Sequence, residues 1–384
     1  MNLRLINNSL EALFVLVFIF VAFDAAIAFD YNFDGRLRAD ARWISDSPSD
    51  TDDYDAATEI RLGGYGNFIQ KSAWSLDYEI LIDNRNTWGA TEQVGFVEDW
   101  DVDFFRAWTR LSSSSEDLEL RAGRQQILFG AGALFRPLGF YDNRVISSVF
   151  PLTVGVDSFR LTWHSTDTTT LQSWLVPAKS ESRMIVGGRW EGLVGELETG
   201  IAFQYKPVSD LRDLANFDKE LTQFGYHIKG EYEVGFWNET RFDLESDFGE
   251  TFVRADSVFG TDYTFDVGQG LHVLLEYFIS STEKGFSVVD PKGDQTIHQF
   301  GFQMDQPIGI ATVWRMFAFY DVEDGSFQWA PQIEYALTDE IYLYLQGNLG
   351  GSVKEKNALG RLFRESSVFT GTESSIGLSM IAFF

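Results

Sequence analysis

The chain ends, at residues 373–384, with E-S-S-I-G-L-S-M-I-A-F-F. Counting back from Phe384, every second residue is apolar: Ala382, Met380, Leu378 and Ile376. A period of two puts these side chains on one face of an extended strand and the intervening ones on the other face. The ending therefore predicts a strand that continues to the last residue and has one apolar face.

This ending resembles the closing strand of bacterial outer-membrane β-barrels, in which a terminal Phe is read by the insertion machinery. In such barrels one face of each strand contacts lipid and the other faces the lumen. The resemblance implies that the barrel-assembly machinery recognises Phe384. It also implies that the other partners are outer-membrane lipid and lipopolysaccharide.

Residues 1–28 have the three parts of a secretory signal peptide. Arg4 lies in a short polar region, residues 12–23 form an apolar run, and Ala26-Ile27-Ala28 matches an A-x-A cleavage site. An apolar run of about a dozen residues is short for a transmembrane helix. We expect cleavage before Phe29, with a retained N-terminal anchor as the alternative.

The composition fits a membrane barrel and excludes other classes. The chain has 35 Phe, 11 Trp and 14 Tyr, enough for aromatic girdles at two membrane interfaces. It has no Cys, so neither a disulfide framework nor a Cys metal site is available. The net charge is 30 − 57 = −27, and removing residues 1–28 leaves 29 − 55 = −26. Such acidity argues against nucleic acid as a partner.

From Phe29 onward one unit repeats, a strand of about ten residues followed by a turn or loop. Tight turns alternate with longer polar loops, including 46–55, 83–100 and 130–155. Short periplasmic turns and long external loops are typical of outer-membrane barrels. We therefore predict an all-β fold over residues 29–384, a single transmembrane antiparallel up-and-down β-barrel of about 18 strands in the bacterial outer membrane. A count of 16 stays open, and a soluble half-buried sheet has the same period.

Arginines are concentrated in the first strands. A charge on the lipid face near the membrane centre costs about 2–4 kcal/mol, so charged strand positions should face the lumen. The predicted pore-lining residues are Arg36, Arg38, Arg42, Arg61, Arg106, Arg110, Arg121, Arg124 and Arg160. They would form a basic wall that guides anions, because the planar guanidinium pairs bidentately with carboxylates. The alternative is that Arg–Glu pairs only hold the wall together.

Two local features follow from the spacing of these arginines. Arg106 and Arg110 share one face of their strand, which places Phe105 on the opposite face. Arg121 and Arg124 are separated by an odd number of residues, so a regular strand cannot turn both inward. A β-bulge near Gly123 would allow it.

The stretch L-E-L-R-A-G-R-Q-Q-I-L-F-G-A-G at 118–132 and V-D-S-F-R-L-T-W at 156–163 carry a further resemblance. They resemble the alginate-export family of outer-membrane barrels, over about 45 residues. The matching residues are Gly123, Arg124, Gln125, Gly130, Asp157, Arg160 and Leu161. The resemblance implies an 18-stranded barrel with an arginine-lined pore, and it leaves the solute open.

The loop 130–155 is long and unusually apolar for an external loop. Long loops without secondary structure of their own are usually functional. We expect this loop to fold inward and narrow the pore, with Arg136, Asp142 and Arg144 at the constriction. An external cap that packs its own aromatic residues is the alternative.

No metal site and no cofactor are predicted. The acidic loop 46–55 lacks the D-x-D-x-D-G spacing of a calcium loop, and a solvated surface loop explains it better.

These features predict a channel, a porin or exporter for small or polymeric polar solutes, with a preference for anionic ones such as sugar acids. One alternative is a barrel enzyme acting on lipid or lipopolysaccharide. It would need a nucleophile beside a base, and none of the four histidines lies in a G-x-S-x-G context. The other alternative is a structural or sheath barrel around a partner protein. We expect no enzymatic activity.

Overall fold

The structure is a computed structural model. It describes residues 30–46, 51–71, 73–91, 95–142, 144, 146–149, 151–177, 184–207, 220–247, 250–283, 294–323, 325–352 and 373–384. The predicted signal peptide, residues 1–28, lies outside these ranges. Among the described residues, no helix has the length and hydropathy needed to cross a membrane.

The described residues form 18 β-strands. Their bounds are β1 Asp30–Asp46, β2 Thr51–Gln70, β3 Trp74–Thr91, β4 Gly95–Ser113, β5 Leu118–Gln125, β6 Val156–Thr166, β7 Thr169–Pro177, β8 Met184–Val194, β9 Leu197–Lys206, β10 Glu220–Glu231, β11 Gly235–Asp247, β12 Glu250–Phe265, β13 Leu271–Glu283, β14 Asp294–Ile308, β15 Thr312–Asp321, β16 Ser326–Ala336, β17 Ile341–Ser352 and β18 Glu373–Phe383. The predicted count of 18 is confirmed.

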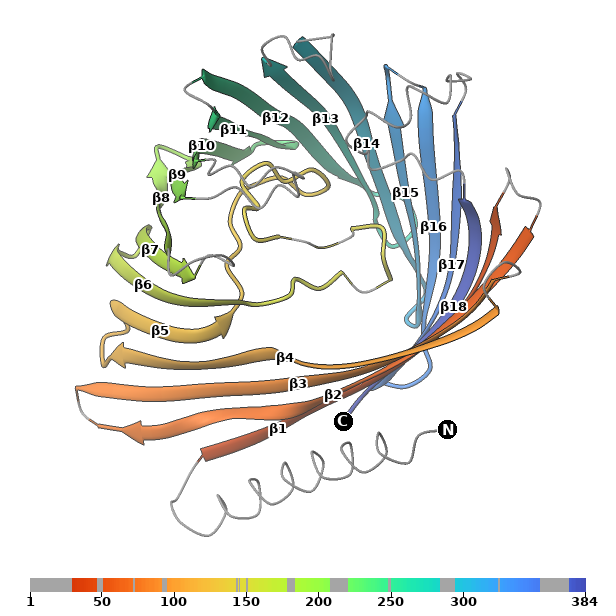
Figure 1. Ribbon diagram of the computed structural model, residues 1–384, viewed down its shortest axis with the longest axis horizontal. Coiled ribbons are helices and arrows are strands. Elements are labelled where there is room, and N and C mark those ends of the chain that lie inside the picture. Colours follow the sequence, from red (N-terminus) through yellow and green to blue (C-terminus); the bar gives the residue numbers. More distant parts are fainter. Residues whose placement is uncertain are drawn as a thin grey trace.

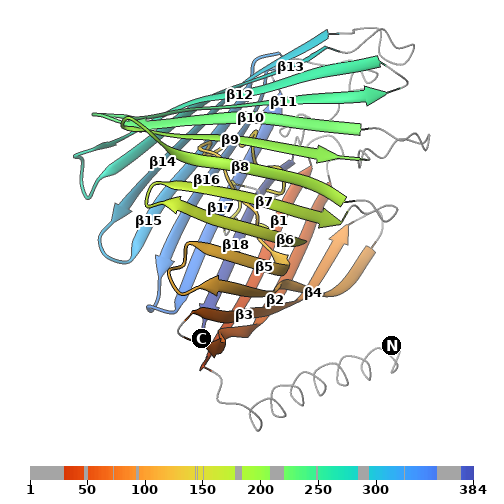
Figure 2. The same cartoon turned by 90° about the vertical axis from the view of Figure 1, so that its left-hand side faces the viewer.

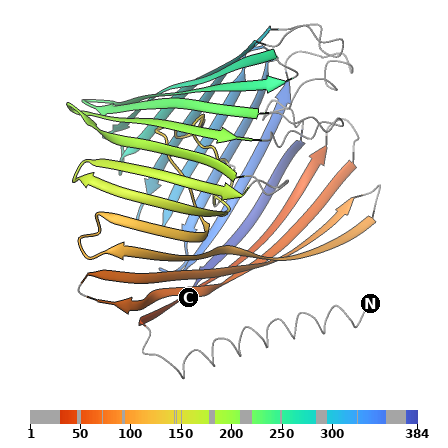
Figure 3. The ribbon, with the colours of Figure 1, turned by 60° about the vertical axis from the view of Figure 1, so that its left-hand side comes forward.

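The strands form one closed antiparallel barrel. Each strand pairs with its neighbours in the chain, and β1 pairs with β18 from Arg36 opposite Phe383 to Asp46 opposite Glu373. Figure 1 shows the resulting ring of strands, and Figures 2 and 3 show from the side that the strands are inclined to one another. Closure pairs the first strand with the last, as a sheet in lipid requires.

The two faces of the wall differ as the period-2 pattern predicts. On β18, Leu378 is 57% exposed and Ile376 49%, whereas Ser379 between Leu378 and Met380 is 1% exposed. The same contrast recurs around the outside of the barrel, where large apolar residues are exposed: Trp74, Phe104, Phe159, Trp163, Phe203, Phe224, Phe259, Phe300 and Trp329. An apolar outer face around a closed barrel is the surface that lipid solvates.

The seam of the barrel depends on a glycine. Gly35 and the terminal Phe384 exchange two backbone hydrogen bonds, N–H to O at 2.9 and 3.0 Å. A Cβ on Gly35 would lie 2.4 Å from the Phe384 ring, so no other residue fits without displacing that ring. The ring itself remains 59% exposed on the outside.

The strands β2, β3 and β4 are longer than predicted. The expected loop 83–100 is mostly strand, since β3 continues to Thr91 and β4 begins at Gly95. Likewise β2 begins at Thr51, inside the expected loop 46–55. The polar sequence predicts loops here, but strand tips that extend beyond the lipid need no apolar face. The paired backbone continues there as a polar hairpin.

Candidate functional site

The segment between β5 and β6, residues 126–155, lies inside the ring of strands (Figure 1). We call it the inward loop. It leaves β5 with a glycine in a conformation that other residues rarely adopt, Gly130 at φ +104°. A Cβ at this position would lie 2.4 Å from the carboxylate of Glu239 on the opposite wall, so glycine also permits the close approach.

Two buried carboxylates on the barrel wall hold the inward loop. Glu239 on β11, fully buried, accepts hydrogen bonds from the backbone N–H groups of Gly132, at 2.7 Å, and Leu138, at 2.5 Å. A buried carboxylate needs several donors to offset the loss of water, and backbone N–H groups provide them without a counter-charge. Glu239 therefore ties two points of the loop to one wall position.

Glu276 on β13 is the second anchor and is also fully buried. It accepts the N–H groups of three successive loop residues, Ala133 at 2.6 Å, Leu134 at 2.9 Å and Phe135 at 2.7 Å. The indole Nε1 of Trp237 donates to the same carboxylate at 2.8 Å. Successive N–H groups that converge on one anion form a backbone nest, here filled by a side chain of the wall.

Apolar contacts complete the attachment. Leu134 packs in a buried cluster with wall residues Trp237, Val258, Leu274, Phe317, Phe319 and Ala330. The ring of Phe135 stacks on that of Phe278 with centroids 5.1 Å apart. Apolar wall side chains can face the lumen here because the inward loop covers them. A part of the wall in contact with water would instead be polar.

Further hydrogen bonds along the inward loop tie it to other strands. Wall side chains donate to loop carbonyls at four places: Arg160 to Gln126 at 3.1 Å, Arg241 to Pro137 at 2.6 Å, Gln332 to Ser147 at 2.6 Å and Arg106 to Thr153 at 2.8 Å. These contacts reach β6, β11, β16 and β4, so the loop crosses the lumen instead of lying along one side.

The three residues predicted at the constriction lie together on the inward loop. Asp142 contacts both arginines, with Arg136 Nη1 at 2.8 Å and Arg144 Nη2 at 2.5 Å. Thr153 Oγ1 donates to the same carboxylate at 3.0 Å. Burial raises the pKa of Asp142, and the Thr153 hydrogen bond and the Arg136 charge partly offset that rise.

Most of the predicted pore-lining arginines are paired with carboxylates. Arg61 binds Asp83 at 2.5 Å through two nitrogens, and Arg110 binds Asp77 at 2.9 Å. The other pairs are Arg36 with Glu59, Arg38 with Asp40, and Arg42 with Asp55. Arg38 and Asp40 both lie on β1. At the other four positions, the geometry favours the alternative in which ion pairs link the strands of the wall.

Three other predicted arginines, Arg106, Arg121 and Arg160, make no ion-pair contact with a carboxylate in the described part of the chain. The guanidinium of Arg121 lies 4.1 Å over the ring of Trp108. Arg106 and Arg160 donate to loop carbonyls, as described above. The Nε atoms of Arg121 and Arg160 are buried without a hydrogen-bond partner among the described residues.

Strand register brings two of these arginines beside a third. Arg121 on β5 lies directly opposite Arg110 on β4 and opposite Arg160 on β6. Residues opposite each other in antiparallel strands share a face. We call Arg110, Arg121 and Arg160 the arginine row. The spacing of arginines in the sequence predicted each member but not their alignment, which depends on the register of two strand pairs.

The strand geometry corrects two expectations. The β5 register runs without a shift from Leu118 to Gln125, so the predicted bulge near Gly123 is wrong. Arg124 therefore lies on the opposite face from Arg121 and pairs with Asp157 at 3.1 Å and Asp103 at 2.6 Å. A bulge occurs elsewhere, between β3 and β4.

That bulge changes the position of Phe105. Leu81 pairs with Arg106 and Ile82 with Phe104, which leaves Phe105 as the extra residue. The guanidinium of Arg61 lies 3.2 Å over the Phe105 ring, on the side of the arginines and not opposite them. An inserted residue reverses the alternation of a strand, so counting by twos fails across it.

A cavity of about 340 Å³ lies between the inward loop and the wall formed by β1–β3 and β16–β18. Its lining is polar and of both charges, and includes Arg38, Asp40, Arg42, Asp55, Arg85, Gln328, Gln346 and Asn348. Arg85 is not among the predicted pore-lining residues, because the sequence predicts a loop at residue 85. The register of β2 and β3 identifies Arg85 as a wall residue, because it places Arg85 on β3 opposite Glu59.

Comparisons with known proteins concern the fold. No family model matches the chain, and no curated protein matches it. Solved structures do match: OccK7 (OpdD) of Pseudomonas aeruginosa, with a TM-score of 0.57 and 11% identity, covers 92% of this chain and 99% of its own. OccAB3 of Acinetobacter baumannii has a TM-score of 0.57 and 10% identity, and the match covers 92% of this chain and 99% of OccAB3.

OmpT, an outer membrane protein of Vibrio cholerae, matches with a TM-score of 0.51 and 10% identity over 93% of this chain and 100% of its own. At such identities the likeness concerns backbone architecture. The apolar outer face, the closed antiparallel sheet and these matches agree. The chain has the closed 18-stranded antiparallel fold of outer-membrane β-barrels.

Proposed function

We propose that this protein is a non-enzymatic outer-membrane channel that passes polar solutes around the inward loop and prefers anions. The arginine row carries the proposal. Like charges directly opposite each other destabilise a sheet. Among the described residues, Arg110 has the carboxylate partners Asp77 and Glu119, and the other two row members have none. Guanidinium groups aligned in this way, two of them without a carboxylate partner among the described residues, suit a wall that anions contact as they pass.

The net charge of the chain does not oppose this proposal. Selectivity depends on the charges beside the narrow part of the path, where low-dielectric walls focus the field. Carboxylates on exposed hairpins that lie more than a Debye length of about 8–10 Å from that path are largely screened. The paired arginines of β1 and β2 contribute little, since each is neutralised by its carboxylate.

Sugar acids are the solutes we favour within this proposal. A carboxylate matches the guanidinium fork, and sugar hydroxyls can use amides such as Gln328 and Gln346 beside the cavity. The resemblance to the alginate-export family supports the same class. Its motif residues meet where the inward loop leaves the wall: Arg124 pairs with Asp157, and Gln125 donates to the Ser158 carbonyl at 3.1 Å.

Two partners belong to the same proposal, the barrel-assembly machinery at Phe384 and lipopolysaccharide at the external rim. The sheath alternative is disfavoured because the inward loop crosses the lumen where a partner protein would sit. The likeness to OccK7 and OccAB3 concerns the fold alone and gives the enzyme alternative no support.

The reversal potential in a planar bilayer under a KCl gradient tests the proposal. We expect the wild type to prefer chloride. The double variant Arg121→Gln, Arg160→Gln should lose most of that preference, because it removes the two row members that have no carboxylate partner. Arg254→Gln is the matched control: this arginine lies on β12 and pairs with Asp256 at 3.0 Å.

A cation-selective wild type would refute the anion preference. Equal shifts in the double variant and in Arg254→Gln would show that the row is not the selective element. Absence of any ohmic current from correctly folded protein would refute the channel itself.

A further inference from the structure

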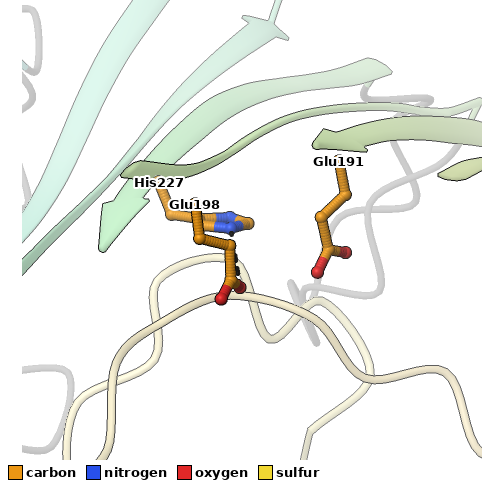
Figure 4. A group of neighbouring side chains, drawn as sticks. All are labelled: Glu191, Glu198 and His227. Atoms are coloured by element: carbon orange, nitrogen blue, oxygen red, sulfur yellow. Dashed lines mark ion pairs between the residues drawn. The ribbon is translucent and has the colours of Figure 1, made fainter. Parts of the chain in front are cut away.

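A histidine and two glutamates converge on the lumen side of β8, β9 and β10, away from the arginine row. Glu191 lies on β8, Glu198 on β9 and His227 on β10. One ligand atom from each residue lies within 4.8 Å of those of the other two. Figure 4 shows the three side chains pointing to the same side of the sheet.

A glycine makes this convergence possible. Register places Glu191, Gly200 and His227 in one row across the three strands. Because Gly200 has no side chain, the His227 ring lies over it: a Cβ there would be 2.3 Å from Cε1 and 3.0 Å from Nε2. The ring is thereby directed along the sheet toward the two glutamates, while their carboxylates approach from the neighbouring strands.

His227 has an unused nitrogen inside this cluster. The residue is 4% exposed, and its Nε2 has no hydrogen-bond partner in the described part of the chain. The Glu198 Oε1 atom lies 3.8 Å from it, beyond hydrogen-bond range. A buried polar atom without a partner is destabilising, so a polar group or ion at this point would relieve the cost.

We propose that Glu191, Glu198 and His227 bind a divalent transition-metal ion, with Zn²⁺ as the best fit. Imidazole and carboxylate are ligands that Zn²⁺ takes readily, at bond lengths of about 2.0–2.2 Å. In a tetrahedral site such bonds place the ligand atoms about 3.4 Å apart. The His227–Glu198 distance of 3.8 Å is close to that value, and a rotation of Glu191 would bring in the third ligand.

Two neighbouring cations compete with a metal ion for the carboxylates of this site. Arg189 Nη1 lies 2.8 Å from Glu191 Oε2, which leaves the other carboxylate oxygen for a metal ion. Lys229 lies opposite Glu198 in the β9–β10 register. These two cations balance the two carboxylates, so the ion must compete with them. The imidazole therefore contributes the neutral donor on which binding depends most.

The position of the site indicates from which side of the membrane a metal ion can reach it. Glu191 and Glu198 flank the hairpin between β8 and β9, whose turn at Gly195 is short. Short turns lie at the periplasmic end in this class of barrel. The Glu198 side chain is 46% exposed, so the fourth coordination position would open to the lumen near its periplasmic mouth.

Co²⁺ titration of the purified, metal-stripped protein in detergent tests the inference. Co²⁺ reports its ligand geometry through visible absorption, and Zn²⁺ added afterwards should abolish the spectrum by displacement. We expect one such site in the wild type. His227→Gln and Glu198→Gln should each weaken binding at least about tenfold, a loss that even ligand-orienting residues produce. The matched control His164→Gln removes an exposed histidine bonded to Thr170 and should bind as the wild type does.

Far-UV circular dichroism and heat-shifted gel mobility establish folding for each variant. Glu198 is half exposed, so Glu198→Gln keeps the test decisive if His227→Gln does not fold. Absence of a Co²⁺ spectrum in the folded wild type would overturn the inference, as would a spectrum that both ligand variants leave unchanged. The measurement needs no ion current, so it stands apart from the proposed channel function.

Discussion

Glu276 on β13 accepts the backbone N–H of Phe135 at 2.7 Å, although 141 residues separate the two in the chain. This contact belongs to a set of hydrogen bonds from successive loop residues to one carboxylate, and Glu239 repeats the arrangement nearby. The inward loop is thus held by wall side chains that bind its backbone. Its position depends on two carboxylates more than on the loop's own charged residues.

Glu276→Gln should therefore loosen the inward loop. The amide keeps one acceptor oxygen but turns an NH₂ group toward loop N–H donors, and each hydrogen bond to the lost charge is worth about 1.5–3 kcal/mol. We expect larger and noisier single-channel currents. Glu340→Gln, in the exposed turn before β17, is the control. Traces identical to the wild type would contradict the anchoring role.

Asp142 should make the selectivity pH-dependent. Burial raises the pKa of this carboxyl, so acidification protonates it before exposed aspartates. Protonation removes a negative charge between Arg136 and Arg144, and the anion preference should grow as the pH falls through that raised pKa. Asp142→Asn should show the stronger preference at neutral pH and lose this part of the pH dependence. The measurement is the reversal potential of the wild type and of Asp142→Asn at several pH values. Parallel pH curves for the two proteins would contradict the role of Asp142.

Phe384→Ala should impair assembly more than stability. The substitution removes an exposed, lipid-facing ring worth about 1.5–3 kcal/mol but keeps both backbone hydrogen bonds to Gly35. We expect low outer-membrane yield in cells and near-normal refolding in detergent. Phe265→Ala, which also removes an exposed ring at a strand end, is the control for a general loss of aromatic surface. A matching loss in cells and in detergent would argue against recognition by the assembly machinery.

Adjacent residues of β17 should differ sharply in their tolerance of charge. Leu345 is 45% exposed on the outer face, whereas Gln346 lines the cavity in the lumen. Leu345→Lys should lower the free energy of unfolding by about 2–4 kcal/mol in lipid bilayers, and Gln346→Lys by much less. Denaturant titration of both variants measures the difference. Equal losses would mean that the two faces are assigned incorrectly.

The sequence by itself determined the class of fold and the face of each regular strand, and it favoured 18 strands over 16. These follow from a local property: in lipid, the outer side chain at every second position must be apolar, as Ile376, Leu378 and Met380 show. It also indicated that loop 130–155 has a special role, because its apolar residues need cover that solvent does not provide.

Only the tertiary structure decided which arginines are neutralised and which are aligned. Arg36 and Arg121 look alike in the sequence, yet Glu59 pairs with the first and Trp108 lies under the second. Those partners depend on strand register, and one bulge at Phe105 is enough to reverse the alternation. The anchors of the inward loop and the Glu191–Glu198–His227 group join elements that no local pattern relates, because barrel closure and loop folding bring distant residues together.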